Sequence, residues 1–246
     1  MRLLIVNPNT SERITEVIAR QAERVASPGT EVIAATARFG VSYIETQSEA
    51  VVAAHATLEA LADHAGDCDA AIIAAFADPG LEGARAMLDI PVVGIAQAAM
   101  TTASLLGNRF SLVSISRRMI PLFHACVERN GMASRLASMR MVEGPVRDVA
   151  AARVDLEEPL VELCQRAVDE DGADVVVLAG GPLAGLADQV AGRITVPVVD
   201  AVASAVRLAE GLAAGYGGRR RAVERRHPEK AFTGISPVLA AMLGGA

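Results

Sequence analysis

Two short apolar runs, each followed by the same order of segments, constrain the fold of this chain most strongly. They lie in Ala70–Leu81 and Val175–Leu186, and each ends in a turn that carries Pro and Gly. Unbroken apolar runs of this length are typical of strands that are buried on both faces of a parallel sheet. A helix-compatible segment follows each run, and then a second apolar run that contains Pro-Val-Val. The repetition predicts a duplicated strand–loop–helix–strand unit.

The spacing of the two copies predicts how they face each other. Position 180 follows position 75 by 105 residues, and Pro197 follows Pro91 by 106 residues. This near-constant offset predicts an α/β fold of two pseudo-symmetric, open parallel-sheet (Rossmann-like) halves with a cleft between them. We assign residues 1–98 plus 207–246 to the first half and residues 99–206 to the second. Positions 75 and 180 are then expected to face each other across the cleft.

Composition excludes several classes of function. With 23 basic and 29 acidic residues the net charge is −6, which argues against nucleic acid as a partner. No apolar stretch is long enough to span a membrane, and the apolar run at the N-terminus is too short for a signal peptide. The three cysteines and four histidines lack metal-ligand spacing, so no metal or other cofactor is expected. We expect a cytoplasmic protein with a small-molecule ligand.

Small polar residues follow the first strand of each half. Asn7 and Asn9 follow the apolar run Leu3–Val6, and Ser114 and Ser116 occupy the matching place around the end of Phe110–Ile115. Ligands of open α/β sheets bind outside the carboxyl ends of the strands. These four polar residues are therefore expected at the cleft.

The remaining periodicity predicts the other elements and one packed tail. Further strands are expected at Glu31–Ala37 and Ala137–Val142, and helices at Glu12–Val25, Thr46–His64, Ala96–Leu106, Met119–Arg129, Glu157–Asp171 and Ala201–Tyr216. The polar stretch Gly217–Lys230 is expected to be a surface excursion. The apolar segment Ile235–Leu243 is expected to pack onto the body or onto a neighbouring subunit, which favours a homo-oligomer.

Several motifs, in this order along the chain, resemble those of a known superfamily. They are VNPNTSERITEVI, IIAAFADPGLEGA, IPVVGIAQAAM, RFSLVSISRR and VPVVDAVASAVRLAEGL. The set resembles the aspartate/glutamate/hydantoin racemase superfamily, and within it the hydantoin and allantoin racemases most closely. The resemblance implies two α/β halves around a ligand cleft, and dimers or larger symmetric oligomers. It also implies an acid–base pair of cysteines, one from each half, that act on opposite faces of a carbon acid.

This chain departs from the family pattern at the positions that matter most. Ala75 and Gly180 occupy the two cysteine positions, and Gln97 stands where the hydantoin racemases typically have a glutamate. Neither Ala nor Gly has a side chain that can carry a proton. The remaining cysteines, Cys68, Cys126 and Cys164, are expected to serve in packing. Two-cysteine racemisation is therefore not expected.

Asp78 and Tyr43 are the candidate catalytic residues that remain. Asp78 precedes Pro79, so it either caps the helix that begins there or turns into the cleft. Tyr43 lies with Glu45 in a loop that covers the cleft in the family; it is either a phenolic acid–base group or a lid aromatic. Asp200, at the end of the second Pro-Val-Val run, is a further titratable candidate.

The candidate ligand-binding residues combine backbone donors with small polar side chains. They are Asn9, Ala75, Phe76, Ser114, Ser116, Gly180 and Gly181. Backbone N–H groups at such turns bind carboxylates and polarised carbonyls. If Gly180 faces the cleft, its replacement by Leu is expected to abolish ligand binding and to leave the melting temperature nearly unchanged.

Two classes of function remain open. In the first, the chain is a hydantoin/allantoin racemase-like enzyme that acts on a small cyclic ureide, imide or carboxylate by a non-cysteine mechanism of isomerase, lyase or hydrolase type. In the second, it is a catalytically silent member that binds such a ligand or a paralogous subunit. A titratable group in the cleft favours the first class, and a cleft of backbone amides with Ala and Gly favours the second.

Overall fold

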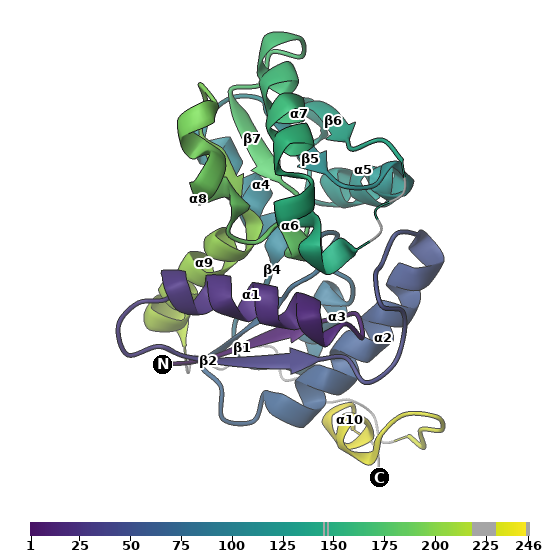
Figure 1. The fold of residues 1–246 in the computed structure, drawn as a ribbon. Helices are drawn as coiled ribbons and strands as arrows, with labels where there is room; N and C mark the ends of the chain where they lie inside the picture. Colours follow the sequence, from purple (N-terminus) through teal and green to yellow (C-terminus); the bar gives the residue numbers. More distant parts are fainter. Residues whose placement is uncertain (145, 147, 218–229, 245–246) are drawn as a thin grey trace.

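The computed structural model describes residues 1–144, 146, 148–217 and 230–244. It contains two four-stranded parallel sheets, with strand orders β2-β1-β3-β4 and β6-β5-β7-β8. Figure 1 shows the first sheet in the lower part of the molecule and the second in the upper part. The predicted α/β fold of two pseudo-symmetric parallel-sheet halves is confirmed.

All eight strands expected from the apolar runs are present. They are β1 (Arg2–Asn7), β2 (Glu31–Thr36), β3 (Ala70–Ile73), β4 (Val92–Gly94), β5 (Phe110–Ser114), β6 (Leu136–Met141), β7 (Val175–Leu178) and β8 (Val198–Asp200). Alternate residues of one strand enter different cores: in β1, Leu3 and Ile5 face the core between the halves, whereas Leu4 and Val6 face an outer core. Burial on both faces explains why the inner strands β1, β3, β5 and β7 are mostly apolar, whereas the edge strands β2 and β6 are more exposed and more polar.

The helices comprise the six expected ones, each within a few residues of its predicted range, and several shorter ones. They are α1 (Glu12–Val25), α2 (Gln47–His64), α3 (Leu81–Met87), α4 (Ile95–Leu106), α5 (Ile120–Arg129), α6 (Ala152–Asp155), α7 (Glu157–Asp169), α8 (Leu186–Val190), α9 (Ala201–Tyr216) and α10 (Pro237–Met242). Local chemistry sets their starts. Ser11 caps α1, and Thr46 and Glu49 form a reciprocal capping box at the start of α2.

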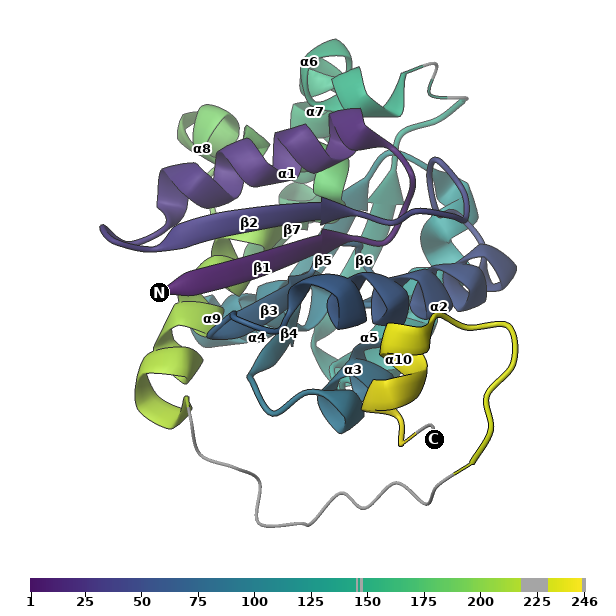
Figure 2. The ribbon, with the colours of Figure 1, turned by 90° about the horizontal axis from the view of Figure 1, so that it is seen from below.

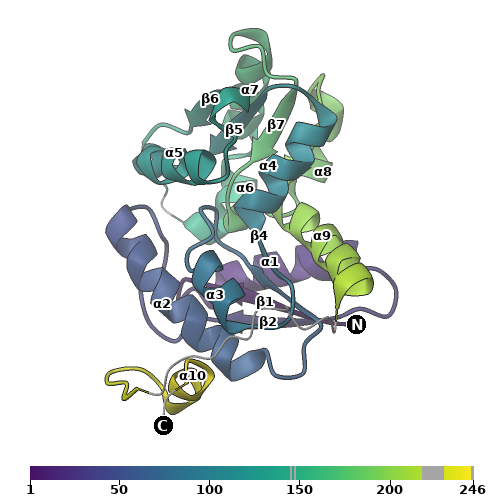
Figure 3. The same cartoon turned by 180° about the vertical axis from the view of Figure 1, so that it is seen from behind.

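The helix that leaves the last strand of each half packs across to the other half. Helix α4 follows β4 but contacts β7 and β8, and α9 follows β8 but contacts β3 and β4. The two helices also pack on each other, side by side in the view of Figure 3. This exchange joins the halves through one shared core. The predicted boundaries at 98/99 and 206/207 stay a prediction.

The C-terminal helix packs on the body of its own chain. Helix α10 contacts α2, as Figure 2 shows; Leu239 is buried, and Met242 packs against the outer core of the first half. The backbone N–H of Ser236 donates to Glu59 Oε1 at 2.9 Å and fixes the start of this segment. The predicted surface excursion at Gly217–Lys230 lies almost entirely outside the described residues.

Candidate functional site

The loops after β3 and β7 face each other between the halves and enclose a small cavity. Ala75 and Gly180 both border it, and the complete lining is Asn9, Ile14, Tyr43, Ile44, Ala74, Ala75, Phe76, Met119, Gly180, Gly181 and Pro182. Its volume is about 20 Å³, which is room for about one water molecule. Five of the predicted ligand-binding residues and Tyr43 thus surround one point, and Tyr43 is the one titratable side chain among them.

The second loop owes its shape to two glycines. Gly180 has φ +141°, a conformation that residues with a Cβ rarely adopt, and a Cβ on Gly181 would lie 2.9 Å from Ile18 Cδ1. The expectation that Leu at position 180 leaves the melting temperature unchanged is therefore wrong. Its Cβ would have open space, 3.8 Å from Ser114 Oγ, but the backbone would be strained.

The two asparagines after β1 build the neighbouring loop. Asn7 Nδ2 donates to Asn9 Oδ1 at 2.9 Å and to Thr15 Oγ1 at 3.0 Å, and Asn9 Oδ1 also accepts from the backbone N–H of Ser11. Both asparagines are buried. Asn9 borders the small cavity while its side-chain oxygen is engaged in holding this turn.

Asp78 faces a helix terminus and does not border the small cavity. Its two carboxylate oxygens accept from the backbone N–H groups of Ala96 and Gln97, each at 2.8 Å, so it caps the first turn of α4. The expected cap of the helix after Pro79 is corrected, because Gly80 is the N-cap of α3. Positive φ angles at Ala77 (112°) and Asp78 (53°) turn the carboxylate towards α4. Burial raises the pKa of Asp78 to about 7, although the two N–H groups oppose this shift.

Asp200 has the corresponding capping role in the second half, from the end of β8. One carboxylate oxygen accepts from the backbone N–H of Ala203 at 2.8 Å, and the other accepts from that of Gly185 at 2.6 Å. It therefore caps α9 and fastens the loop after β7 to β8. Burial raises the pKa of this carboxyl group as well.

The two predicted serines separate in the structure. Ser114 is buried, and its hydroxyl donates to the carbonyl oxygen of Ala179 at 2.5 Å, so it fastens β5 to β7. Ser116 lies farther along the loop, where its hydroxyl donates to Glu45 Oε1 at 2.5 Å. Of the two, Ser116 alone lines a cavity.

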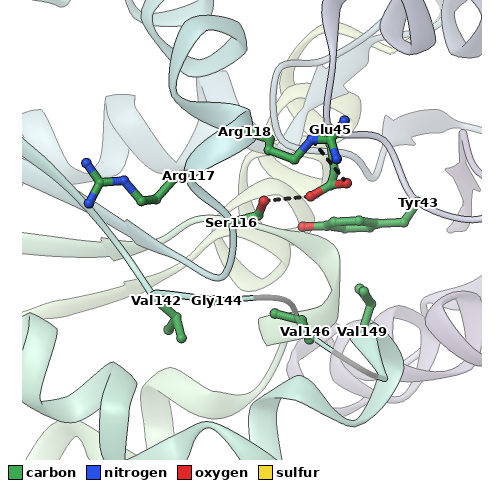
Figure 4. A pocket seen from close by; sticks show the side chains of 9 residues that line it. All are labelled: Tyr43, Glu45, Ser116, Arg117, Arg118, Val142, Gly144, Val146 and Val149. Carbon is green, nitrogen blue, oxygen red and sulfur yellow. Dashed lines mark hydrogen bonds and ion pairs between the residues drawn. The ribbon is translucent and has the colours of Figure 1, made fainter.

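That cavity, which we call the Tyr43 pocket, is much larger than the one between Ala75 and Gly180. Its volume is about 360 Å³, and its lining is Tyr43, Glu45, Ser116, Arg117, Arg118, Val142, Gly144, Val146 and Val149. Figure 4 shows the Tyr43, Glu45 and Ser116 side chains gathered on one side, with Val142, Val146 and Val149 facing them. Since Tyr43 lines both hollows, its ring separates the small cavity from the pocket.

The polar groups of the Tyr43 pocket are held by neighbouring elements. The backbone N–H groups of Glu45 and Thr46 donate to Glu49 of α2 at 2.7 and 2.9 Å, which positions the Tyr43 loop. Arg118 Nε lies 4.0 Å from Glu45 Oε2.

The Tyr43 hydroxyl donates to Met119 Sδ at 3.0 Å. Burial, and then the charge of Glu45, raise the pKa of Tyr43, so the phenol is a proton or hydrogen-bond donor at neutral pH and not a base.

The sequence did not single out Arg118 or the valine wall of this pocket. The signal was weak, because the lining comes from loops near residues 43, 117 and 146 that are far apart in the chain. The run Ser116-Arg117-Arg118 at the carboxyl end of β5 was the part that could have been found.

The three cysteines contribute no alternative acid–base pair. All are buried, and burial raises the pKa of Cys126 and of Cys164 to about 12, so neither is a thiolate at neutral pH. Within the described part of the chain, no group of His, Cys, Asp and Glu side chains is arranged to hold a metal ion. No helix in that part is both long enough and apolar enough to cross a membrane.

Comparison with known proteins agrees with this architecture. The family model described as Asp/Glu/Hydantoin racemase matches residues 3–209. The chain is 37% identical to a hydantoin racemase of Paenarthrobacter aurescens over 222 residues, which is 88% of this chain and 93% of the relative.

Two solved structures are similar over nearly the whole chain. An allantoin racemase from Klebsiella pneumoniae superposes with a TM-score of 0.88 at 36% identity and covers 95% of this chain and 96% of its own. The allantoin racemase of Pseudomonas fluorescens gives a TM-score of 0.87 at 37% identity, over 95% of this chain and 100% of its own. By the family match over residues 3–209 and by its identity to these relatives, the chain belongs to the Asp/Glu/hydantoin racemase family.

Proposed function

We propose that this chain is a racemase-family enzyme that acts on a small cyclic ureide, imide or carboxylate bound in the Tyr43 pocket. One observation carries the proposal: a hollow of about 360 Å³ brings a carboxylate, two hydroxyl groups and two guanidinium groups together beside the ring of Tyr43. A volume of this size suits a small-molecule ligand. The hydantoin and allantoin racemases that resemble the chain suggest the substrate class.

The polar groups complement the edge of a ureide or imide ring. Such a ring presents N–H donors beside C=O acceptors. The Glu45 carboxylate can accept from a ring N–H, while the Tyr43 hydroxyl and the Arg118 guanidinium can donate to a carbonyl oxygen. Arg117 and Arg118 would bind a carboxylate in the same place.

The chemistry we propose is proton transfer at a carbon next to a carbonyl. Glu45 takes the proton, the C–H electron pair moves into a new C=C bond, and the carbonyl oxygen becomes an enolate oxygen. A hydrogen bond from Tyr43 stabilises the charge that develops there. The Glu45 carboxyl proton exchanges with solvent, and return of a proton from Glu45 to the same carbon restores the C–H bond and the carbonyl. Because one carboxylate serves one face of the carbon, this cycle exchanges the proton and retains the configuration.

Asp78 stays in the proposal as a second candidate for proton transfer. Its pKa of about 7 suits a general base, and it lies three residues after Ala75. To act directly it would have to release the N–H groups of Ala96 and Gln97.

The catalytically silent alternative rests on a different observation. Tyr43 is the one titratable side chain around the small cavity between Ala75 and Gly180, which has room for about one water molecule. A ligand held by those loops alone would meet backbone amides and no base.

Calorimetric titration of the full chain with hydantoins, allantoin, cyclic imides and dicarboxylates tests the proposed site. We expect at least one class to bind, Glu45→Gln and Arg118→Gln to weaken it by about tenfold or more, and Arg207→Gln, on exposed surface of α9, to leave it unchanged. Binding that is insensitive to Glu45→Gln and Arg118→Gln would exclude the Tyr43 pocket as the site. Bound ligand without turnover would favour the silent alternative.

The proposed assembly is a homo-oligomer. Leu105 and Leu106 at the end of α4 are exposed, at 81% and 53%, and such side chains suit contact with a second copy. Light scattering is expected to give a mass at least twice the 25.5 kDa of the monomer. A monomer at all concentrations would contradict this part of the proposal.

A further inference from the structure

A second large cavity lies between α1 of the first half and the α6–α8 region of the second. Its volume is about 360 Å³, and its lining is Val17, Arg20, Gln21, Arg24, Arg153, Ala184, Gly185, Asp188 and Gln189. We call it the arginine pocket. Figure 1 shows α1 running beneath α6 and α8, the elements on which the lining lies. It shares no lining residue with the Tyr43 pocket or with the small cavity.

The arginine pocket is cationic in a chain whose net charge is −6. Three guanidinium groups line it against one carboxylate, that of Asp188, which pairs with Arg24. Arg20 lies 3.8 Å from Glu16, at the edge of ion-pair range. Arg153 is half-buried and forms no hydrogen bond or ion pair with any described residue. The lining therefore retains positive charge that no neighbouring side chain neutralises.

Gln21 supplies an independent sign of a missing partner. Its side chain is 3% exposed, and its Oε1 accepts from Arg24 Nε at 3.0 Å and from Arg24 Nη2 at 2.9 Å. Because arginine can only donate, these bonds fix which end of the amide faces Arg24. Gln21 Nε2 is left as the one buried side-chain nitrogen or oxygen among the described residues that has no partner. An orphaned buried donor is costly, and an acceptor brought by a ligand would satisfy it.

Gln21 and Arg153 approach each other beside one glycine. A Cβ on Gly185 would lie 3.2 Å from Gln21 Oε1, the amide atom that Arg24 already binds, and 3.4 Å from Arg153 Nη1. The absence of a side chain at position 185 thus keeps space open where the amide of α1 and the guanidinium of α6 approach each other. A small group placed there would contact both halves of the molecule.

We propose that the arginine pocket binds a small oxyanion, a carboxylate or a phosphate. The oxyanion would accept from Gln21 Nε2 and from the Arg153 guanidinium, and Arg20 would add attraction from the rim. Since α1 and α6 belong to different halves, the bound anion would hold the two halves together.

Calorimetric titration of the full chain with inorganic phosphate, and separately with succinate, at constant ionic strength tests this proposal. At least one of the two should bind saturably. Arg153→Gln and Gln21→Leu should each weaken that binding by roughly tenfold or more. The matched control Arg207→Gln removes one positive charge on α9 and should retain binding of either anion. Arg118→Gln in the Tyr43 pocket should retain phosphate binding, and it is tested with phosphate alone because succinate, a dicarboxylate, also suits the Tyr43 pocket. Melting curves without anion report whether each variant is folded.

Each result decides for or against the site. Saturable binding that Arg153→Gln abolishes and Arg118→Gln retains supports it. Binding of neither anion overturns it, and so does binding that chloride matches at equal concentration. Binding lost in Arg118→Gln and kept in Arg153→Gln would move the anion to the Tyr43 pocket. The proposal would then fail while the proposed function would gain support.

Discussion

In both halves a carboxylate caps the helix that packs across to the other half, but the carboxylate comes from a loop in one half and from a strand end in the other. At α4 the carboxylate is that of Asp78, from the loop after β3, and the strand end beside it is Gly94. At α9 the carboxylate is that of Asp200, on the strand end itself, and the loop position that matches Asp78 is Leu183. A Cβ on Gly94 would lie 2.1 Å from Asp78 Cγ, so the first half has room for one carboxyl group there and no more.

The loops that carry these positions differ in the same way. Gly80 and Gly185 occupy matching positions, and both have positive φ. The second loop has a further glycine at positive φ, Gly180, whereas the first loop has Ala77 and Asp78. Residues with a Cβ in such conformations cost about 1–3 kcal/mol each. The first loop is therefore the strained one, and it borders the small cavity beside Tyr43. The comparison teaches that the two halves share the place of a carboxyl group at a helix N-terminus, and not the residue that supplies it.

Moving the carboxylate of the first half from the loop to the strand end should change the free energy of unfolding more than any other variant that tests this comparison. Gly94→Asp alone should lower the free energy of unfolding by roughly 3–5 kcal/mol, because two carboxyl groups would compete for one space. Adding Asp78→Gly, which copies the arrangement of the second half, should recover most of the loss. Denaturant melts of the two variants give the answer. A double variant that is no more stable than Gly94→Asp would show that the two sites are not equivalent.

The pH dependence of stability should identify Asp78 next. Its folded pKa of about 7 lies above the unfolded value of about 4, so the folded state holds the extra proton between these values. The contribution of Asp78 to stability is then greatest below about pH 4 and falls as the pH rises towards 7, by up to about 1.4 kcal/mol for each pH unit. Asp78→Asn should remove this contribution and leave that of Asp200, whose pKa is also raised. Melting temperatures from pH 4 to 8 measure it, and superimposable profiles for the two proteins would count against the assignment.

Exchanging alanine and glycine at positions with positive φ should change the free energy of unfolding least. Ala77→Gly is expected to raise the free energy of unfolding by roughly 0.5–2 kcal/mol, because glycine relieves the strain at φ +112°. Gly180→Ala makes the reverse change at a positive φ of the other loop, at the position that matches Ala75, and should lower the free energy of unfolding by a similar amount. Urea denaturation separates the two. Destabilisation by Ala77→Gly would mean that the buried methyl group outweighs the strain.

The sequence predicted the sheets well because their physics is local. The inner strands are buried on both faces and so appeared as apolar runs, and the partly exposed edge strands β2 and β6 still hold enough apolar residues to be recognised. The offset of the copies indicated two like halves. Of the residues that the sequence predicted to share one site, five line the small cavity: Asn9, Ala75, Phe76, Gly180 and Gly181. These residues follow directly from the ends of strands.

The direction of side chains within the loops could not be predicted in this way. Asp78 faces α4 because Ala77 and Asp78 adopt positive φ, which the types of these residues do not indicate. The Tyr43 pocket joins loops from three distant parts of the chain, and its Ser116–Glu45 hydrogen bond spans 71 positions. Such contacts depend on how the halves are placed, and no local pattern records that placement.

The central claim is that chemistry in this chain does not use a pair of acid–base groups at positions 75 and 180. The most direct test measures exchange of the α-carbon proton of a substrate together with the configuration at that carbon. Each enantiomer of allantoin and of a 5-substituted hydantoin would be incubated with the enzyme in deuterated water. Proton NMR would follow exchange, and chiral chromatography would follow configuration. The account predicts exchange above the uncatalysed rate with the configuration retained, and loss of that exchange in Glu45→Gln. Inversion as fast as exchange would contradict it, because two groups on opposite faces of the carbon would then be at work.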